Sequence, residues 1–167
     1  MKVLKKKILD LDSLKKIIRG FKEEEKIIVH CHGCFDLVHY GHIKHFKEAR
    51  EQGDILIVTV TEDRYVNKGK GRPFFTEDQR CEFLEQLEII DYLALNNAAS
   101  SAAIIRFLAP DIYVKGIEYK NMQEDPKLIE EMSAIESVKG KIYYTDDIVF
   151  SSTHLIENGL KELTVAI

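Results

Sequence analysis

Five short apolar runs, separated by segments of helical periodicity, constrain the fold of this chain more than any other feature. The runs are rich in β-branched residues and show no polar alternation, which is typical of strands covered on both faces of a parallel sheet. Parallel neighbours need crossover connections, and the intervening helical segments can supply them. The pattern predicts an α/β fold, a doubly wound, Rossmann-like five-stranded parallel sheet with helices on both faces. The runs are residues 27–29, 55–60, 89–95, 111–114 and 141–144.

Helical apolar spacing fills the gaps between these runs. One helix is expected before the first run, four between the runs and a terminal one after residues 151–153, and local signals place one end of each of the first five. The apolar faces of the third and fifth helices should include Phe83 and Ile129. The signals are an end near Gly20, a start near Gly41, a capping box over residues 76–79, a cap at Ser101, and a start at Asp125 and Pro126.

A length of 167 residues indicates a single domain with one core. Within residues 1–167 we expect an amino-terminal helical segment over residues 1–25, the core of the domain over 26–158, and a tail over 159–167. Three cysteines form no disulfide framework, which favours a reducing, cytoplasmic location. No apolar stretch approaches the roughly 18 residues of a membrane span, and the basic start lacks the apolar segment of a signal peptide. We therefore expect no membrane association.

A formal net charge of −4 argues against a general nucleic-acid-binding surface. Positive charge is concentrated instead at Lys68, Lys70 and Arg72, in a polar loop over residues 61–75 that follows the second apolar run. Loops of that length are usually functional. We therefore expect a small phosphate compound, and not a nucleic acid, as the partner.

The turn after the first apolar run has the features of a phosphate site. Residues 33–42 read Gly-Cys-Phe-Asp-Leu-Val-His-Tyr-Gly-His, and a helix should begin near Gly41. The first N–H groups of a helix have no intrahelical partners and lie at the positive end of its dipole, so anions bind there. The imidazoles of His39 and His42 would join them. Gly41 would let the backbone approach the phosphate closely because it has no Cβ.

Further polar groups are expected at the same edge of the sheet. In doubly wound sheets, ligands bind beyond the carboxyl ends of the strands. Lys68, Arg72 and Lys115 follow predicted strands, as does the turn of residues 33–42. Residues 151–153, Ser-Ser-Thr, come after the fifth strand and can supply hydroxyls and N–H groups at another helix start. We expect all of them to meet in one crevice.

Such a constellation suits the transfer of a nucleotidyl group. In that reaction the phosphate oxygen of an acceptor attacks the α-phosphorus of a nucleoside triphosphate, and pyrophosphate leaves. The acceptor is already a nucleophile, so positioned cations and N–H donors suffice without a covalent intermediate. His39 and His42 would contact the α- and β-phosphates, and Lys68 and Lys70 would close over them.

Two motifs carry a resemblance to a known family. Residues 33–42 resemble the GxFDxxHxGH signature of the cytidylyltransferase-like nucleotidyltransferases, and residues 150–153, Phe-Ser-Ser-Thr, resemble their second, ISST-type motif. The motifs stand in the family's order at opposite ends of one domain. The resemblance covers about residues 26–158.

The resemblance implies roles for residues along most of this length. It also implies Mg²⁺ as the companion of the triphosphate, held mainly by the triphosphate itself, and a homodimer as the assembly. The implied catalytic residues are His39, His42, Lys68 and Lys70; the implied nucleotide-binding residues are Gly33, Cys34, Phe35, Gly41, His42, Arg80, Lys115, Gly116, Ser151, Ser152 and Thr153; the implied substrate-binding residues are Asp36, Lys70 and Arg72.

Within this family, residues 68–73 and 110–116 most resemble the adenylyltransferase half of ADP-heptose synthase, which exchanges the pyrophosphate of ATP for a heptose 1-phosphate. That resemblance implies ATP and a phosphorylated sugar as substrates. Glycerol-3-phosphate cytidylyltransferase, which uses CTP and a polyol phosphate, is the runner-up. Its second motif begins with an arginine, whereas Asp146 stands at the matching position here. The Ser-Ser-Thr run also differs from the usual Ser-Thr-Thr of the heptose enzymes, so the acceptor stays open.

Two other functional classes stay open beside this interpretation. A non-catalytic nucleotide sensor would use the same fold and the same phosphate contacts. A metal or redox site is the other, because His30, Cys31, His32, Cys34 and His45 include a Cys-x-x-Cys spacing that both kinds of site use. Metal analysis and thiol titration would distinguish the second class.

Structural roles are the alternative for several of these residues. Residues 151–153 can be an ordinary helix cap. Arg80 can be a helix-surface charge, and Asp36 can bind the backbone of its own turn. Tyr113 is most simply a core residue, and Glu131 and its neighbour Glu130 are expected on a solvated helix face.

Overall fold

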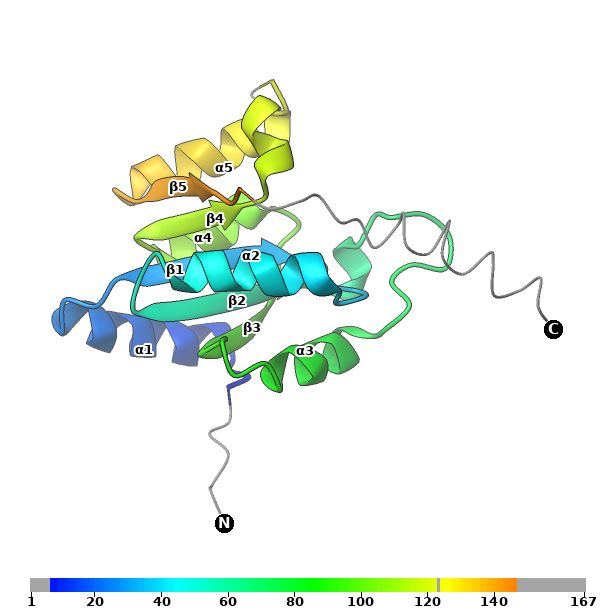
Figure 1. Cartoon of the computed structure of the whole chain (residues 1–167), viewed down its shortest axis with the longest axis horizontal. Coiled ribbons are helices and arrows are strands. Elements are labelled where there is room, and N and C mark those ends of the chain that lie inside the picture. The colour runs from blue at the N-terminus through cyan, green and yellow to red at the C-terminus, as the bar shows by residue number, and fades with distance from the viewer. Residues whose placement is uncertain (1–6, 123, 147–167) are drawn as a thin grey trace, which may run out of the picture.

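The computed structural model describes residues 7–122 and 124–146 of the chain. In this part, five strands form one sheet in the order β3-β2-β1-β4-β5, with every neighbouring pair parallel (Figure 1). The order reverses between β1 and β4, as in a doubly wound sheet. The predicted fold class is confirmed. The strands are β1 (Ile28–Gly33), β2 (Ile55–Thr61), β3 (Tyr92–Asn96), β4 (Ile112–Lys115) and β5 (Lys141–Tyr144).

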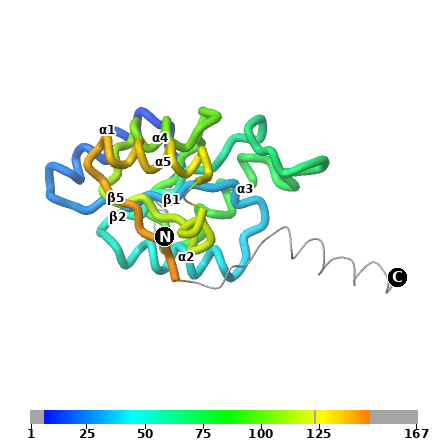
Figure 2. Tube along the Cα trace, turned by 90° about the horizontal axis from the view of Figure 1, so that it is seen from above, coloured from blue at the N-terminus to red at the C-terminus, as the bar shows by residue number. Residues whose placement is uncertain are grey.

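Helices cover both faces of the sheet, as predicted. One face carries α2 (Tyr40–Arg50) and α3 (Glu77–Glu85), and the other carries α1 (Leu11–Glu23), α4 (Ser101–Leu108) and α5 (Pro126–Ser137). Figure 2 shows the sheet edge-on between these two layers. Two short 3-10 helices, η1 (Asp63–Tyr65) and η2 (Ile117–Asn121), follow β2 and β4 at the carboxyl edge.

The two hydrophobic layers follow from the pleat of the strands, because successive side chains point to opposite faces. Val29 and Cys31 of β1 pack with Phe46 of α2 on one face. Ile28, from the same strand, packs with Leu14 of α1 on the other. All five side chains are fully buried. Burial on both faces explains why the strands read as continuous apolar runs rather than as an alternating pattern.

Helix ends follow the predicted chemistry with small shifts. Thr76 and Gln79 form the expected capping box at α3, and Asp125 caps α5 ahead of Pro126. The cap of α4 is Ser100 and not Ser101, because the Ser100 hydroxyl accepts the N–H of Ala102. The first helix continues past Gly20 to Glu23, since the ring of Phe21 packs against Tyr92.

Other expectations from the apolar pattern were wrong. Phe83 and Ile129 were expected on the packed faces of their helices but are 56% and 51% exposed. The third strand begins at Tyr92 rather than at residue 89, and β1 extends through Gly33, beyond the apolar run. The last difference matters for the site, because it makes His30 and His32 strand residues. No helix in the described ranges is long and apolar enough to cross a membrane.

Candidate active site

A cavity of about 760 Å³ opens at the carboxyl ends of β1 and β4, where the strand order reverses. Its walls come from the turn after β1, the loop after β2, the end of β4 with η2, and the start of α5. Ligands of doubly wound sheets bind at this switch point. A cavity therefore lies at the predicted edge of the sheet and brings together part of the predicted set. The predicted residues that line it are Gly33, Cys34, Phe35, His39, Gly41, His42, Lys68, Lys115 and Gly116.

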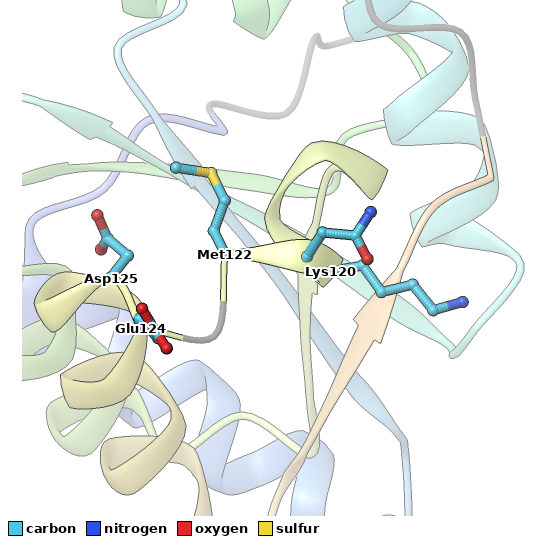
Figure 3. Close-up of a pocket in the computed structure, with 5 residues that line it drawn as sticks. Lys120, Met122, Glu124 and Asp125 are labelled. Carbon is cyan, nitrogen blue, oxygen red and sulfur yellow. The ribbon is translucent and has the colours of Figure 1, made fainter.

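A second hollow, of about 560 Å³, lies at the rim of this cavity (Figure 3). It surrounds the segment between η2 and α5, and Met122 and Asp125 line both spaces. The labelled side chains in Figure 3 do not converge: Lys120 points away from Glu124 and Asp125. This hollow therefore adjoins the main cavity and does not form a separate site.

The start of α2 carries the two motif histidines side by side. The rings of His39 and His42 are stacked with centroids 3.9 Å apart. The backbone N–H of His39 donates to Nδ1 of His42 at 3.3 Å. Because Nδ1 accepts this bond, the proton of a neutral His42 ring is on Nε2. The pair thus adds a ring N–H donor to the backbone donors of the helix start.

The surroundings favour the neutral form of both rings. Burial, followed by the charges of His39, His45 and Lys68, lowers the pKa of His42 to about 3. Burial and then Lys68 also lower the pKa of His39. A bound polyphosphate would oppose these effects, because its negative charge favours the imidazolium form.

Phe35 supports the histidine pair from the hydrophobic core. Its backbone is left-handed, with φ of 51°, and its ring is buried. The ring meets His42 edge-on with centroids 5.4 Å apart and also packs on Phe46. A Cβ on Gly33 would lie 2.8 Å from the Phe35 ring, so glycine is needed for this packing. Gly33 and Phe35 therefore shape the turn that carries the histidine pair.

The two loop lysines differ in position. Lys68 lines the cavity, and its charge acts on His39, His42 and Cys34. Lys70 is exposed and does not line the cavity. Both lysines were predicted to be catalytic, and the structure brings only Lys68 to the histidine pair.

Asp36 and Arg72, both predicted to bind substrate, form an ion pair with each other. The Nε of Arg72 donates to Oδ2 of Asp36 at 2.6 Å, and both side chains are buried. Oδ1 of Asp36 accepts the backbone N–H groups of Phe74 and Phe75. Burial acts to raise the pKa of Asp36, but these N–H groups and Arg72 together hold it below its usual value. Neither residue lines the cavity, and together they anchor the loop that carries Lys68.

Arg80 lies behind the cavity wall, and its side chain is only 2% exposed. Its guanidinium donates to the carbonyl oxygens of Thr61, Phe75 and Cys34. It also forms an ion pair with Asp63 at 2.7 Å. Arg80 therefore ties together the turn after β1, the end of β2 and the loop before α3, and it does not line the cavity.

Lys115 reaches the cavity from the end of β4 as part of a buried charge pair. Its Nζ lies 2.8 Å from Oε2 of Glu131 and over the ring of Tyr119. The other carboxylate oxygen of Glu131 accepts the hydroxyls of Tyr113 and Ser101. The expectation that Glu131 lies on a solvated face was wrong. Glu131 is 5% exposed because α5 packs over the end of β4.

Sequence reasoning also missed the cavity residues His32 and Thr61. The ring of His32 lies between the hydroxyls of Thr59 and Thr61, and both His32 and Thr61 line the cavity. Alternation along β1 would have found His32, because it lies two residues beyond the buried His30 on the same face. The apolar run ended too early for that argument to be applied.

The metal or redox alternative finds no support in the described residues. Cys31 is fully buried and burial raises its pKa, whereas Cys34 lies at the cavity. All three cysteines are free. Between residues 7 and 146, residue 123 apart, no group of three or more His, Cys, Asp or Glu side chains is placed to hold a metal ion.

The second motif lies outside the described residues. Ser151, Ser152 and Thr153 were expected to complete the phosphate contacts. Their roles stay predictions.

Comparison with known proteins places this geometry in a family. The sequence profile of the cytidylyltransferase-like family matches residues 30–158. The bifunctional protein HldE of Wolinella succinogenes is 33% identical over 138 residues, covering 81% of this chain and 29% of that protein. HldE of Campylobacter jejuni subsp. doylei is 40% identical over 113 residues, covering 66% and 24%. The chain thus spans less than a third of the length of these relatives.

Solved structures agree with this placement. A lipopolysaccharide core biosynthesis protein from Thermoplasma volcanium is 28% identical, with a TM-score of 0.61 over 74% of this chain and 99% of that one. A pantoate-β-alanine ligase from Francisella tularensis shares the fold, with a TM-score of 0.64 over 95% of this chain and 76% of that one, at 14% identity. The profile match extends over the switch-point cavity and the paired histidines, so this chain belongs to the cytidylyltransferase-like family of nucleotidyltransferase domains.

Proposed function

We propose that this domain joins the nucleoside monophosphate of ATP to a sugar phosphate of the heptose 1-phosphate type and releases pyrophosphate. One observation carries the proposal. The stacked His39 and His42, the start of α2 and Lys68 converge on one side of a cavity that continues to Lys115. The space is large enough for a nucleotide and a second ligand.

The histidine side of the cavity suits the triphosphate. The helix start and the ring N–H of His42 would bind non-bridging phosphate oxygens, and Lys68 would neutralise charge that develops at the α-phosphorus and on the departing pyrophosphate. The acceptor phosphate would attack in line from the opposite side, without a proton transfer from the protein. These groups form a preorganised electrostatic site.

Mg²⁺ is proposed as the companion of the triphosphate. In the described residues, two carboxylates close in sequence to the histidine turn and the Lys68 loop are paired with other groups, Asp36 with Arg72 and Asp63 with Arg80. The donor set therefore suits an ion that arrives with the triphosphate and keeps most of its water ligands. When bound, Mg²⁺ would neutralise charge on the phosphate oxygens.

The names of the relatives support a sugar acceptor. One solved relative is a lipopolysaccharide core biosynthesis protein, and the curated relatives are bifunctional HldE proteins. This chain covers only one part of those relatives. We propose that this part is the nucleotidyl-transferring one, acting as a homodimer that light scattering of the purified chain can test.

The test is pyrophosphate release over a grid of substrates with Mg²⁺. ATP, CTP, GTP and UTP are each combined with heptose 1-phosphate, glycerol 3-phosphate and ribitol 5-phosphate. Release that requires ATP and heptose 1-phosphate is the expected result. Release that requires CTP and glycerol 3-phosphate would replace the proposed substrates. Nucleotide binding without release from any pair would favour a sensor and contradict the proposed reaction.

A further inference from the structure

A chain of hydrogen bonds runs from the sheet interior to the cavity. Nε2 of His30 and Nδ1 of His32 each lie 2.8 Å from the hydroxyl of Thr59. Nε2 of His32 lies 3.3 Å from the hydroxyl of Thr61. His30 and Thr59 are fully buried, whereas His32 and Thr61 line the cavity. Two buried groups therefore control the hydrogen bonding of two groups that a ligand can reach.

His30 and His32, the two histidines of this hydrogen-bond chain, are neutral near pH 7. Burial and then the neighbouring His32 lower the pKa of His30 to about 3. Burial lowers the pKa of His32 to about 4, where the carboxylate of Glu131 acts to raise it and Lys115 to lower it. Each ring thus carries one proton, on one of its two nitrogens.

The hydroxyl of Thr59 has a single proton, so it donates to only one of the two rings. If it donated to His30, the proton of that ring would be on Nδ1, which is buried and has no hydrogen-bond partner. An orphaned buried N–H is rare and costly, on the order of 1–3 kcal/mol. Donation from Thr59 to His32 avoids it and leaves only a lone pair of His30 unpaired.

This arrangement determines what the cavity presents. With Nδ1 of His32 accepting from Thr59, the proton of His32 is on Nε2, which donates to Thr61. The hydroxyl proton of Thr61 is then available to a ligand. At 3.3 Å the bond from His32 to Thr61 is long, so a ligand oxygen can also take the Nε2–H. Thr61 is held in place because its carbonyl accepts from Arg80 at 2.7 Å.

The surroundings of this pair favour an uncharged partner. The charges that act on His32 are those of Glu131 and Lys115, which form an ion pair at 2.8 Å and shift its pKa in opposite directions. Lys68, by contrast, acts on the His39 and His42 side. Directed donors in a locally balanced field suit hydroxyl groups better than phosphates.

We propose that His32 and Thr61 bind hydroxyl groups of a sugar ring and so help to determine substrate specificity. Thr59 and His30 are positioning residues that fix the ring proton of His32. The inference rests on the proposed function, which brings two sugars to the cavity, the ribose of the nucleotide and the sugar of the acceptor. Ribose and acceptor sugar share the same hydroxyl chemistry.

The first test is the ring proton itself, measured by long-range ¹H–¹⁵N correlation spectra of the histidines in the whole chain. We expect His32 in the Nε2–H form in the wild type and in Thr59→Ser, which keeps the hydroxyl. Thr59→Val should give a mixture of the two forms. An Nδ1–H form in the wild type, or no change in Thr59→Val, would overturn the arrangement.

The second test is equilibrium binding by calorimetry to the wild type, His32→Ala, Thr61→Val and the conservative His32→Gln. The ligands are ATP, its 2′-deoxy and 3′-deoxy forms, heptose 1-phosphate, glycerol 3-phosphate and pyrophosphate. We expect His32→Ala and Thr61→Val to weaken binding of a sugar ligand about tenfold, as for one lost hydrogen bond. Pyrophosphate binding should not change, and His32→Gln should recover part of the loss.

The ligands separate the two sources of the sugar. Weaker ATP binding together with lost discrimination against a deoxy form identifies the ribose, and weaker heptose 1-phosphate binding identifies the acceptor. Unchanged binding of every sugar ligand, or an equal loss that extends to pyrophosphate, would overturn the proposal. Neither test needs turnover. A wild type that releases no pyrophosphate would contradict the proposed function and leave both measurements interpretable.

Discussion

The rings of His39 and His42 are stacked 3.9 Å apart at the first turn of α2, and the backbone of His39 holds Nδ1 of His42. This contact leaves Nε2 of His42 as a donor in a helix start that already favours anions. The two rings and the helix start therefore act as one phosphate-binding unit.

His42→Ala removes the donor without altering the core. We expect kcat for pyrophosphate release to fall about 10²–10³-fold, as for the loss of one preorganised transition-state donor. The free energy of unfolding should fall by about 1–2 kcal/mol, since the cap bond to His39 and the ring contacts with His39 and Phe35 are lost. Lys47→Ala, on the exposed side of the same helix, is the control. Turnover near the wild-type value would exclude His42 from the reaction.

Lys68→Ala and Lys70→Ala form a matched pair in one loop. Both lysines are exposed, but Lys68 lines the cavity and acts on the histidine pair, whereas Lys70 lies outside the lining. We expect Lys68→Ala to raise the KM for triphosphate and lower kcat by tenfold or more, and Lys70→Ala to change each less than threefold. Steady-state kinetics at fixed ionic strength measure both. Equal effects of the two changes would mean that the loop closes differently on the ligand.

Much of this fold follows from the sequence, and the failures have identifiable causes. The continuous apolar runs reveal the parallel sheet because both faces are covered. The apolar run stops before the end of β1 because His30 and His32 interrupt its pattern. Inside the sheet, each of these rings forms a hydrogen bond with the buried Thr59. Polar residues that are paired inside a sheet look like a loop to any argument from hydrophobicity alone.

In the candidate site, too, residues placed by a local motif could be predicted, whereas residues placed by tertiary packing could not. The residues that meet in the cavity by local geometry, such as His39 and His42, follow from the motif. Glu130 and Glu131 are neighbours of identical type, and only the packing of α5 on β4 separates the exposed one from the buried one. The burial of Arg80 could not be predicted for a similar reason. Its long side chain turns inward and donates to three carbonyl groups from different segments of the chain.

Acid should destabilise the protein through its buried histidines. The pKa of His30 is lowered to about 3, chiefly by burial, against 6.5 for an ordinary histidine. Between these values the unfolded chain binds a proton that the folded protein does not, so the stabilisation is complete above pH 6.5 and is lost as the pH falls. His32 and His42 behave alike. As the pH falls below 6.5, the free energy of unfolding should decrease by up to about 1.4 kcal/mol per pH unit for each of these histidines.

His30→Gln is the change that isolates one of these protons. Urea unfolding at pH 5, 6, 7 and 8 should show a free energy of unfolding that falls with acid in the wild type. In the variant, this free energy should change less with pH, by the amount that corresponds to one proton bound on unfolding. The slope, rather than the absolute stability, is the quantity compared. A slope that the substitution does not change would show that His30 is protonated in the folded protein.

Arg80→Ala should destabilise the domain rather than act on substrate directly. The change leaves the carbonyl groups of Thr61, Phe75 and Cys34 without their donor and Asp63 without its partner. We expect a loss of about 3–5 kcal/mol in total, because a buried acceptor left without its donor costs about 1–3 kcal/mol. Asp63 adds little to this loss, since its side chain is 37% exposed. Urea unfolding measures this loss, and Arg80→Lys should recover only part of it because lysine lacks the planar fork. A stable Arg80→Ala with a raised KM alone would instead support the nucleotide contact implied by the family.

Glu131→Ala and Glu130→Ala provide the sharpest contrast between neighbouring positions. Glu131 holds Lys115 at 2.8 Å in the buried network with Tyr113 and Ser101. Its loss should cost about 3–5 kcal/mol of the free energy of unfolding, because Lys115 is left as a buried charge without its counter-ion. Glu130 is exposed and accepts only the hydroxyl of Ser100, so its loss should cost less than about 1 kcal/mol.

A double substitution tests whether the loss arises from Lys115 itself. Lys115→Met removes the charge that Glu131 balances, and the two changes together should cost less than the sum of the single ones, by about 1–3 kcal/mol. Urea unfolding of the four proteins in the cycle gives this coupling. Additive costs would mean that Glu131 stabilises the domain through Tyr113 and Ser101 alone, and that Lys115 is free to bind a ligand without it.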